Sequence, residues 1–216
     1  MNIRRVYELL IRGFRRRRMQ RFMATFQPTA QTTLLDVGGT PFNWELIGAA
    51  FPITLLNTEP IADSSLGGRF TRVRGSGTRL DFPDQSFDIA FSNSVIEHVG
   101  SLDAQRAFAK ELRRVGCQLW VQTPARGFFF EPHLLAPFIH YLPLAWQRRL
   151  ARNFTLWGWL TRPSREAVDR MLGGLRLLDH ATFRELFPDC EIRRERFLGF
   201  TKAFVAVRVE ALRAAR

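Results

Sequence analysis

The sequence predicts an α/β fold, in which a parallel sheet carries helices on both of its faces. Two observations predict it. From residue 32 onward, short apolar runs alternate with helical segments, and a glycine turn directly follows the first of these runs. The chain has 216 residues, of which 46% are apolar and 24% are charged, as in a globular domain. This composition excludes a disordered chain, a collagen-like chain and a coiled-coil rod.

Proline and glycine punctuation divides this region into elements. The turn Pro83–Ser86 precedes the fourth apolar run, and Pro124 ends the fifth. The expected strands are Thr32–Val37, Ile53–Asn57, Phe70–Arg74, Phe87–Ser92, Gln118–Gln122, Glu191–Phe197 and Ala203–Val209. The expected helices are Asn43–Phe51, Leu102–Val115, Ala181–Phe187 and the polar stretch Pro163–Leu175.

The N-terminal segment is strongly basic. Residues 1–22 hold eight arginines and one acid, Glu8, so they contribute +7 to a formal net charge of +12. Apolar residues recur there at helical spacing, which predicts a basic amphipathic helix over residues 1–28. Two interpretations stay open: the helix packs its apolar stripe on the main domain, or it docks on an anionic membrane surface.

Residues 127–146 form an apolar stretch whose one formal charge is Glu131. Three prolines and the histidines His133 and His140 interrupt it, which argues against a membrane-spanning helix. We therefore expect residues 125–178 to be an insertion that caps a site from the substrate side.

The first chemical motif is Leu34–Gly39, a buried strand that ends in Asp36 and then turns at Gly38 and Gly39. Glycine lets a ligand approach the backbone closely, and open α/β sheets bind ligands at the carboxyl ends of their strands. The third glycine of a nicotinamide fingerprint is missing, and the acid precedes the turn.

The two cysteines, Cys117 and Cys190, are too few for a disulfide framework or a zinc site. They predict reduced thiols, and no signal peptide is visible. We expect no metal, and a cytoplasmic protein for which peripheral contact with the inner membrane face is an alternative.

A second motif, Leu80–Ile89, leads into Phe91–Val99 with Glu97–His98–Val99 at its end. Together with the glycine turn, it resembles the class I S-adenosylmethionine-dependent methyltransferases, in their small-molecule, type 11-like branch. The resemblance covers about residues 33–124. It implies a methyltransferase domain over residues 29–216 and a doubly wound, Rossmann-like sheet of seven strands. The implied order is 3-2-1-4-5-7-6, with strand 7 antiparallel.

The resemblance also implies that S-adenosylmethionine is the cofactor and assigns its contacts. The glycine turn would surround the methionine part, the end of the second strand the ribose, a Gly-Ser-Gly segment the adenine, and the end of the fourth strand the methyl group. The residues are Asp36, Gly38, Gly39, Asn57, Glu59, Ser76, Gly77, Asn93 and Ser94. Asn57 and Ser76 stand where the family usually has acids, and Thr40–Phe42 replace its later glycines.

The candidate residues on the methyl-acceptor side are inferred from their own chemistry and not from the resemblance. Glu131 and His133 lie in the apolar insertion, where a carboxylate and an imidazole are costly unless partnered, and His98 follows the fourth strand. These three are the candidate catalytic residues, with a structural salt bridge as the alternative for Glu131 and His133.

We expect methyl transfer to a small lipophilic or anionic acceptor, such as a quinone or a lipid-linked saccharide. Two alternatives stay open. One is a non-catalytic binding module with this fold. The other, less favoured, is RNA methylation, since basic charge alone gives unspecific nucleic-acid affinity and no base-methylation signature follows the fourth strand.

Overall fold

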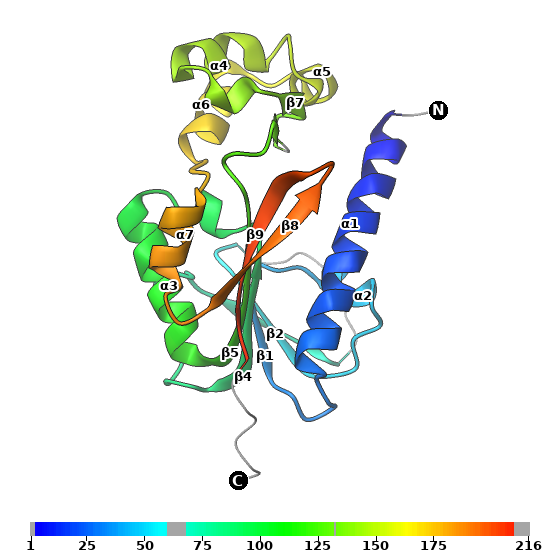
Figure 1. Cartoon of the computed structure of the whole chain (residues 1–216), viewed down its shortest axis with the longest axis vertical. Helices are drawn as coiled ribbons and strands as arrows, with labels where there is room; N and C mark the ends of the chain where they lie inside the picture. Colours follow the sequence, from blue (N-terminus) through cyan, green and yellow to red (C-terminus); the bar gives the residue numbers. More distant parts are fainter. Residues whose placement is uncertain (1–2, 60–67, 132, 210–216) are drawn as a thin grey trace.

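A single seven-stranded sheet forms the centre of the molecule (Figure 1). The computed structural model describes residues 3–59, 68–131 and 133–209, with side chains from residue 12 onward. The strand order is β3-β2-β1-β4-β5-β9-β8, and β9 runs antiparallel to both of its neighbours. The strands are β1 (Leu34–Val37), β2 (Ile53–Asn57), β3 (Phe70–Arg74), β4 (Phe87–Asn93), β5 (Gly116–Pro124), β8 (Glu191–Phe197) and β9 (Phe200–Arg208). The predicted fold class and strand order are confirmed, because β8 and β9 are the sixth and seventh strands of this sheet along the chain.

Helices cover both faces of the sheet. In Figure 1, α1 (Ile3–Phe26) and α2 (Pro41–Glu45) lie on one side, and α3 (Leu102–Val115) and α7 (His180–Leu186) lie on the other. Each face has its own buried apolar cluster, one including Phe22 and Trp44, the other including Phe108 and Phe183.

The C-terminal half of α1 packs on the sheet. Phe22 is fully buried, and its ring makes edge contacts with Trp44, Phe91 and Trp120 at centroid distances of 5.6, 5.4 and 5.7 Å. Arginines on the other side of the same helix, Arg16, Arg17 and Arg21 among them, are exposed. The apolar residues in the C-terminal half of α1 therefore belong to the core of the domain, and the arginines on the other side of this half remain exposed.

One predicted helix is wrong. The pattern predicted a helix over Asn43–Phe51, but α2 begins at Pro41 and ends at Glu45. Pro41 fixes the first helical residue, and the chain then turns through Gly48 at φ +60°, a conformation that a continuing helix does not allow. The first strand also starts two residues later than predicted, because Thr33 bonds the Asp88 carboxylate through its amide and hydroxyl.

The segment after β5 forms a separate small layer at the carboxyl ends of β4 and β5 (Figure 1). Its elements are β6 (Phe130–Glu131), β7 (Ala136–Pro137), a 3₁₀ turn (Ile139–Tyr141), α4 (Leu144–Ala151), α5 (Leu156–Thr161) and α6 (Arg165–Gly173). It has its own buried cluster, which includes Leu134, Ala151 and Leu172. Among the residues that the structure describes, no helix combines the length and apolar character needed to span a membrane.

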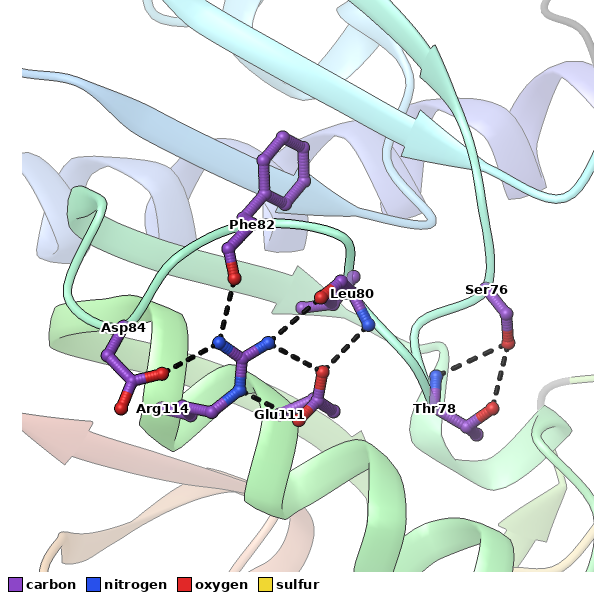
Figure 2. A network of polar contacts seen from close by, with 7 residues as sticks. All are labelled: Ser76, Thr78, Leu80, Phe82, Asp84, Glu111 and Arg114. Atoms are coloured by element: carbon purple, nitrogen blue, oxygen red, sulfur yellow. Dashed lines mark hydrogen bonds and ion pairs between the residues drawn. The ribbon is translucent and has the colours of Figure 1, made fainter.

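The second sequence motif is held by a clamp on α3 (Figure 2). Arg114 donates to the carbonyl oxygens of Leu80 and Phe82 at 2.9 and 2.7 Å and to the carboxylates of Asp84 and Glu111. Glu111 in turn accepts from the Leu80 amide at 2.7 Å. These bonds fix the loop between β3 and β4, and the same loop carries the Gly-Ser-Gly segment at the sheet edge.

Candidate active site

The residues predicted to contact a cofactor come from four neighbouring strands. Gly38 follows β1, Asn57 ends β2, Ser76 follows β3 and Asn93 ends β4. These strands are parallel, so the four residues lie along one edge of the sheet. The strand order reverses between β1 and β4, which is where open α/β sheets bind their ligands.

At the glycine turn, Asp36 is fully buried and accepts from the indole nitrogen of Trp44 at 2.7 Å. Its other oxygen lacks a hydrogen-bond partner among the described residues. Burial raises the pKa of Asp36 to about 7, although the Trp44 bond opposes the rise. A side chain on Gly39 would overlap the Asp36 carboxylate, and Gly38 has a φ of +76°. Both glycines are therefore needed for the turn to close over this carboxylate.

The remaining cofactor candidates differ in their surroundings. The Asn57 amide donates to the Gly39 carbonyl at 2.9 Å and so pins the turn. Glu59 and Ser76 are exposed, and the Ser76 hydroxyl bonds that of Thr78 at 2.8 Å. Gly77 packs on the rings and methyls of the core, where a side chain would overlap Phe108. The structure places all of them at the sheet edge, and their roles toward a cofactor stay predictions.

A buried arginine reaches the end of β4 from α1. Arg18 donates to the Asn93 side chain at 2.6 Å and to Gln122 at 2.8 Å, and it forms a two-point ion pair with Glu195 of β8. Ser94, at φ +57°, donates its hydroxyl to the same Gln122 oxygen at 2.9 Å.

Sequence reasoning missed Arg18 and Glu195. One signal was present: Phe14, Arg18, Phe22 and Phe26 recur every fourth residue, so Arg18 stands within the apolar stripe of α1.

The three predicted catalytic residues do come together. The Nε2 atoms of His98 and His133 lie 3.1 Å apart, and Nδ1 of His133 lies 2.7 Å from Glu131. Glu131 is buried and also accepts from the Leu134 amide at 2.6 Å. His98 belongs to the 3₁₀ turn η1 (Ile96–His98) that follows β4.

Glu97, which sequence reasoning did not single out, completes this cluster. It is fully buried, and one of its oxygens accepts from Thr123 at 3.1 Å. Burial raises the pKa of Glu97 to about 7. Burial and the neighbouring His133 lower the pKa of His98. Burial also opposes protonation of His133, but the Glu131 bond and charge outweigh it, so the pKa of His133 is raised.

A cavity of about 440 Å³ lies between α1, the carboxyl ends of β4 and β5, and the inserted layer. Its lining combines several aromatic rings with basic and imidazole side chains. Lys202 sits 3.4 Å above the Phe14 ring, and burial, followed by the charge of Arg18, lowers its pKa to about 8. The lining includes Phe14, Arg15, Arg18, Ser94, Gln122, Phe128, Phe129, Phe130, His133, His140, Phe197 and Lys202.

Comparison with known proteins gives a partial sequence match. Residues 55–118 match the family described as a methyltransferase domain. An uncharacterized methyltransferase of Mycobacterium marinum is 38% identical over 80 residues, which are 34% of this chain and 31% of that protein. A relative from Mycobacterium tuberculosis is 38% identical over 80 residues, 34% of this chain and 32% of its own. The chain thus spans about a third of the length of the curated relatives that it matches.

Solved structures match over most of the chain. Magnesium protoporphyrin IX methyltransferase from Synechocystis, solved with bound S-adenosylhomocysteine, aligns with a TM-score of 0.56 and 12% identity. The alignment covers 97% of this chain and 89% of that one. A Rhodobacter sphaeroides protein described as a candidate zinc-dependent alcohol dehydrogenase aligns with a TM-score of 0.59, at 12% identity and 88% and 87% coverage. At such identities these likenesses show the fold alone.

Proposed function

Because the chain belongs to the class I S-adenosylmethionine-dependent methyltransferases by its fold and its methyltransferase-domain match, we propose that it methylates a small acceptor. The acceptor in this proposal is largely apolar and carries an anionic or hydroxyl group. The observation that carries the proposal is the aromatic cavity, which lies beside the end of β4, the strand end predicted to face the transferable methyl.

On the cofactor side, the buried Asp36 carboxylate matches the charge of S-adenosylmethionine, which carries an ammonium and a sulfonium. A cation beside Asp36 would favour the ionised carboxylate and supply the partner that one oxygen lacks among the described residues. Asn57 holds the turn through its amide nitrogen, and its amide oxygen is the atom that can accept from a ribose hydroxyl.

On the acceptor side, the cavity joins two kinds of wall. Phe128, Phe129 and Phe197 supply apolar surface, while Lys202 and Arg15 supply positive charge. A molecule with an aromatic or prenyl body and an anionic head satisfies both. The catalytic step is an in-line displacement, so the chain must orient the acceptor, exclude water and favour loss of its proton. His98 and His133, with Glu131 behind them, are the groups placed to favour that loss.

Label transfer tests this function. Purified protein is incubated with methyl-labelled S-adenosylmethionine and a bacterial lipid extract, and organic-phase label is identified by mass spectrometry. Label in an apolar acidic or phenolic compound supports the proposal. Binding of S-adenosylmethionine without methyl transfer to any acceptor would favour the non-catalytic binding module. Label in RNA would refute a small-molecule acceptor and favour RNA methylation.

Lys202→Met should lower kcat/KM for an anionic acceptor by about 10–100-fold, because hydrogen bonds to charged groups contribute about 1.5–3 kcal/mol. Lys202 is charged below its pKa of about 8, so the wild-type KM should rise as the pH passes 8, and this rise should vanish in the variant. Lys110→Met, which changes an exposed lysine on α3, is the matched control. If Lys202→Met and Lys110→Met have the same kcat/KM for the anionic acceptor, Lys202 does not bind the acceptor.

We also infer that the acceptor is met at an anionic bilayer. The inserted layer, the β8–β9 turn and the start of α1 lie at the same end of the molecule (Figure 1). The inserted layer and the β8–β9 turn carry exposed aromatic and aliphatic side chains. Among them are Phe154, Trp159 and Leu198, which are 75%, 63% and 75% exposed. Both α1 and α4 also carry exposed arginines, and helices that lie in the lipid headgroup region typically have such a basic face.

Co-sedimentation with vesicles checks this inference. The protein should bind phosphatidylglycerol vesicles in preference to phosphatidylcholine, since each basic residue near an anionic surface contributes about 1 kcal/mol. The double variant Trp159→Ser and Leu198→Ser should reduce binding at least tenfold. Val209→Ser, an exposed apolar position at the other end of β9, should leave binding unchanged. Equal recovery of all forms in the supernatant would refute membrane contact.

A further inference from the structure

Three metal-ligating side chains converge beside the cavity. Glu97, His98 and His133 each offer one ligand atom, and these atoms all lie within 4.8 Å of one another. Two of the residues belong to the turn after β4 and the third to the inserted layer, so the fold, and not local sequence, creates the cluster. No metal is expected from the sequence, since two cysteines are too few for a zinc site, and His98 and His133 are 35 residues apart in the chain.

The spacing of the two imidazoles fits a shared ion. Their Nε2 atoms face each other at 3.1 Å. Two ligands at zinc bond lengths of about 2.0–2.1 Å are separated by about 3.3 Å in a tetrahedral site. A hydrogen bond between the two rings would also fit this distance. That bond would share one proton between the imidazoles and would give the neighbouring Glu97 carboxylate no partner.

That carboxylate is the second observation. Glu97 is 0% exposed, one oxygen is held by Thr123, and the other has no hydrogen-bond partner among the described residues. A buried carboxylate oxygen left without a donor is costly. A cation at this point would remove the cost and would use the oxygen, together with both imidazoles.

The surroundings also resemble the outer shell of a metal site. Nδ1 of His133 is held by Glu131 at 2.7 Å, and Glu131 is itself fixed by the Leu134 amide. A carboxylate behind a ligating histidine sets its tautomer and orientation and strengthens it as a ligand. This arrangement leaves Nε2 of His133 aimed at the cluster centre.

We propose that Glu97, His98 and His133 bind one divalent transition-metal ion, with zinc as the best match to two imidazoles and one carboxylate. Catalytic zinc sites keep three protein ligands and an open position for water or substrate. His133 also lines the cavity, so the open position faces the acceptor.

The consequence for chemistry rests on the proposed function. An acceptor hydroxyl bound at the open position would release its proton to solvent at neutral pH, because a bound cation stabilises the oxyanion. The oxyanion then forms the O–CH₃ bond while the S–CH₃ bond of the sulfonium breaks, which leaves neutral S-adenosylhomocysteine. The inference therefore narrows the acceptor to a hydroxyl compound.

Cobalt titration of the metal-free 216-residue chain tests the site. Co²⁺ should bind with a stoichiometry of one, with visible absorption bands of an imidazole- and carboxylate-bound ion, and Zn²⁺ should displace it. His133→Ala should abolish the bands. Glu131→Gln should weaken binding by about 10–100-fold, the usual effect of removing a partner behind a ligand. His140→Ala, which changes another cavity histidine, should retain the bands.

Circular dichroism establishes that each variant is folded, and His98→Gln provides a second, milder ligand loss. Stoichiometric binding that survives in both His133→Ala and His98→Gln would overturn the site, as would no binding to the wild type. S-adenosylmethionine binding is measured separately by calorimetry. If the protein binds metal but not S-adenosylmethionine, the proposed function is refuted and the metal site stands. If it binds S-adenosylmethionine but no metal, His98 and His133 form a hydrogen-bonded pair and the metal site is refuted.

Discussion

Asp36→Asn should weaken S-adenosylmethionine binding by about 10–100-fold and, in the same protein, raise the stability of the ligand-free form at pH 8. The affinity loss follows because asparagine keeps the Trp44 bond but cannot carry the charge that attracts an ammonium or sulfonium, and charged hydrogen bonds contribute about 1.5–3 kcal/mol. A structural residue would show the opposite pattern, with a loss of stability and unchanged binding.

The stability gain follows from linkage. The pKa of Asp36 is raised from 3.8 to about 7 in the folded chain, so the folded state binds more protons than the unfolded state between these values. The favourable contribution is complete below pH 4 and is lost as the pH rises through 7. At pH 8 the folded chain therefore carries a penalty of about 4 kcal/mol, which asparagine removes.

Two measurements check this prediction. Thermal unfolding of the wild type and Asp36→Asn should differ at pH 8 and converge near pH 4. Calorimetry with S-adenosylmethionine should show wild-type affinity that rises with pH through about 7 and an affinity in the variant that does not. Asp81→Asn, an exposed carboxylate, is the control. Unchanged affinity in Asp36→Asn would place the cofactor away from the glycine turn.

The sequence predicts the sheet well because its signals are local. Each of the seven expected strands is present in the sheet, and the two motifs identified the strand order through the family resemblance. The prediction of a helix over Asn43–Phe51 was wrong, also for a local reason: Pro41 starts the helix earlier, and the chain turns at Gly48.

The site was only partly predictable because it depends on distant pairing. His98 and His133 could be named as candidates, but their contact depends on how the inserted layer folds back over η1. Glu97 could not be told from a surface acid before Thr123 and the imidazoles were placed around it. Arg18 is one of eight arginines in its segment, and what distinguishes it is Glu195, which lies 177 residues away.

Arg18→Met should destabilise the folded chain by about 3–5 kcal/mol, the usual result of removing one partner of a buried ion pair. Methionine fills a similar volume, so the effect measures lost charge and hydrogen bonds more than lost packing. Glu195 would remain nearly buried without its two-point partner, and Asn93 and Gln122 would each lose a donor. Arg17→Met, at the exposed neighbouring position, should change stability by less than about 0.5 kcal/mol.

The pH dependence separates charge from packing. Burial alone would raise the pKa of Glu195, but the Arg18 bond and charge outweigh burial and lower it. The ion pair therefore contributes stability above the ordinary pKa of 4.5, and this contribution is lost as the pH falls through the lowered value. Without Arg18, burial raises the pKa of Glu195, which can then relieve its penalty by taking a proton. The difference between wild type and Arg18→Met should therefore shrink as the pH falls toward and below the ordinary pKa of 4.5.

The double variant Arg18→Met with Glu195→Met completes the test. Replacing both partners by apolar groups should recover most of the lost stability, because no buried charge then lacks a partner. Denaturant unfolding at pH 8 measures all four proteins of the cycle. If the double variant were as unstable as the sum of the two single variants, α1 would be held by packing alone. The recovery would instead mean that Arg18 and Glu195 are energetically coupled and act with the other contacts between α1 and β8, such as the bond from Arg193 to Thr25. Arg18 also lines the cavity together with Phe14 and Phe197, so this coupling would link the anchoring of α1 to one wall of the candidate acceptor site.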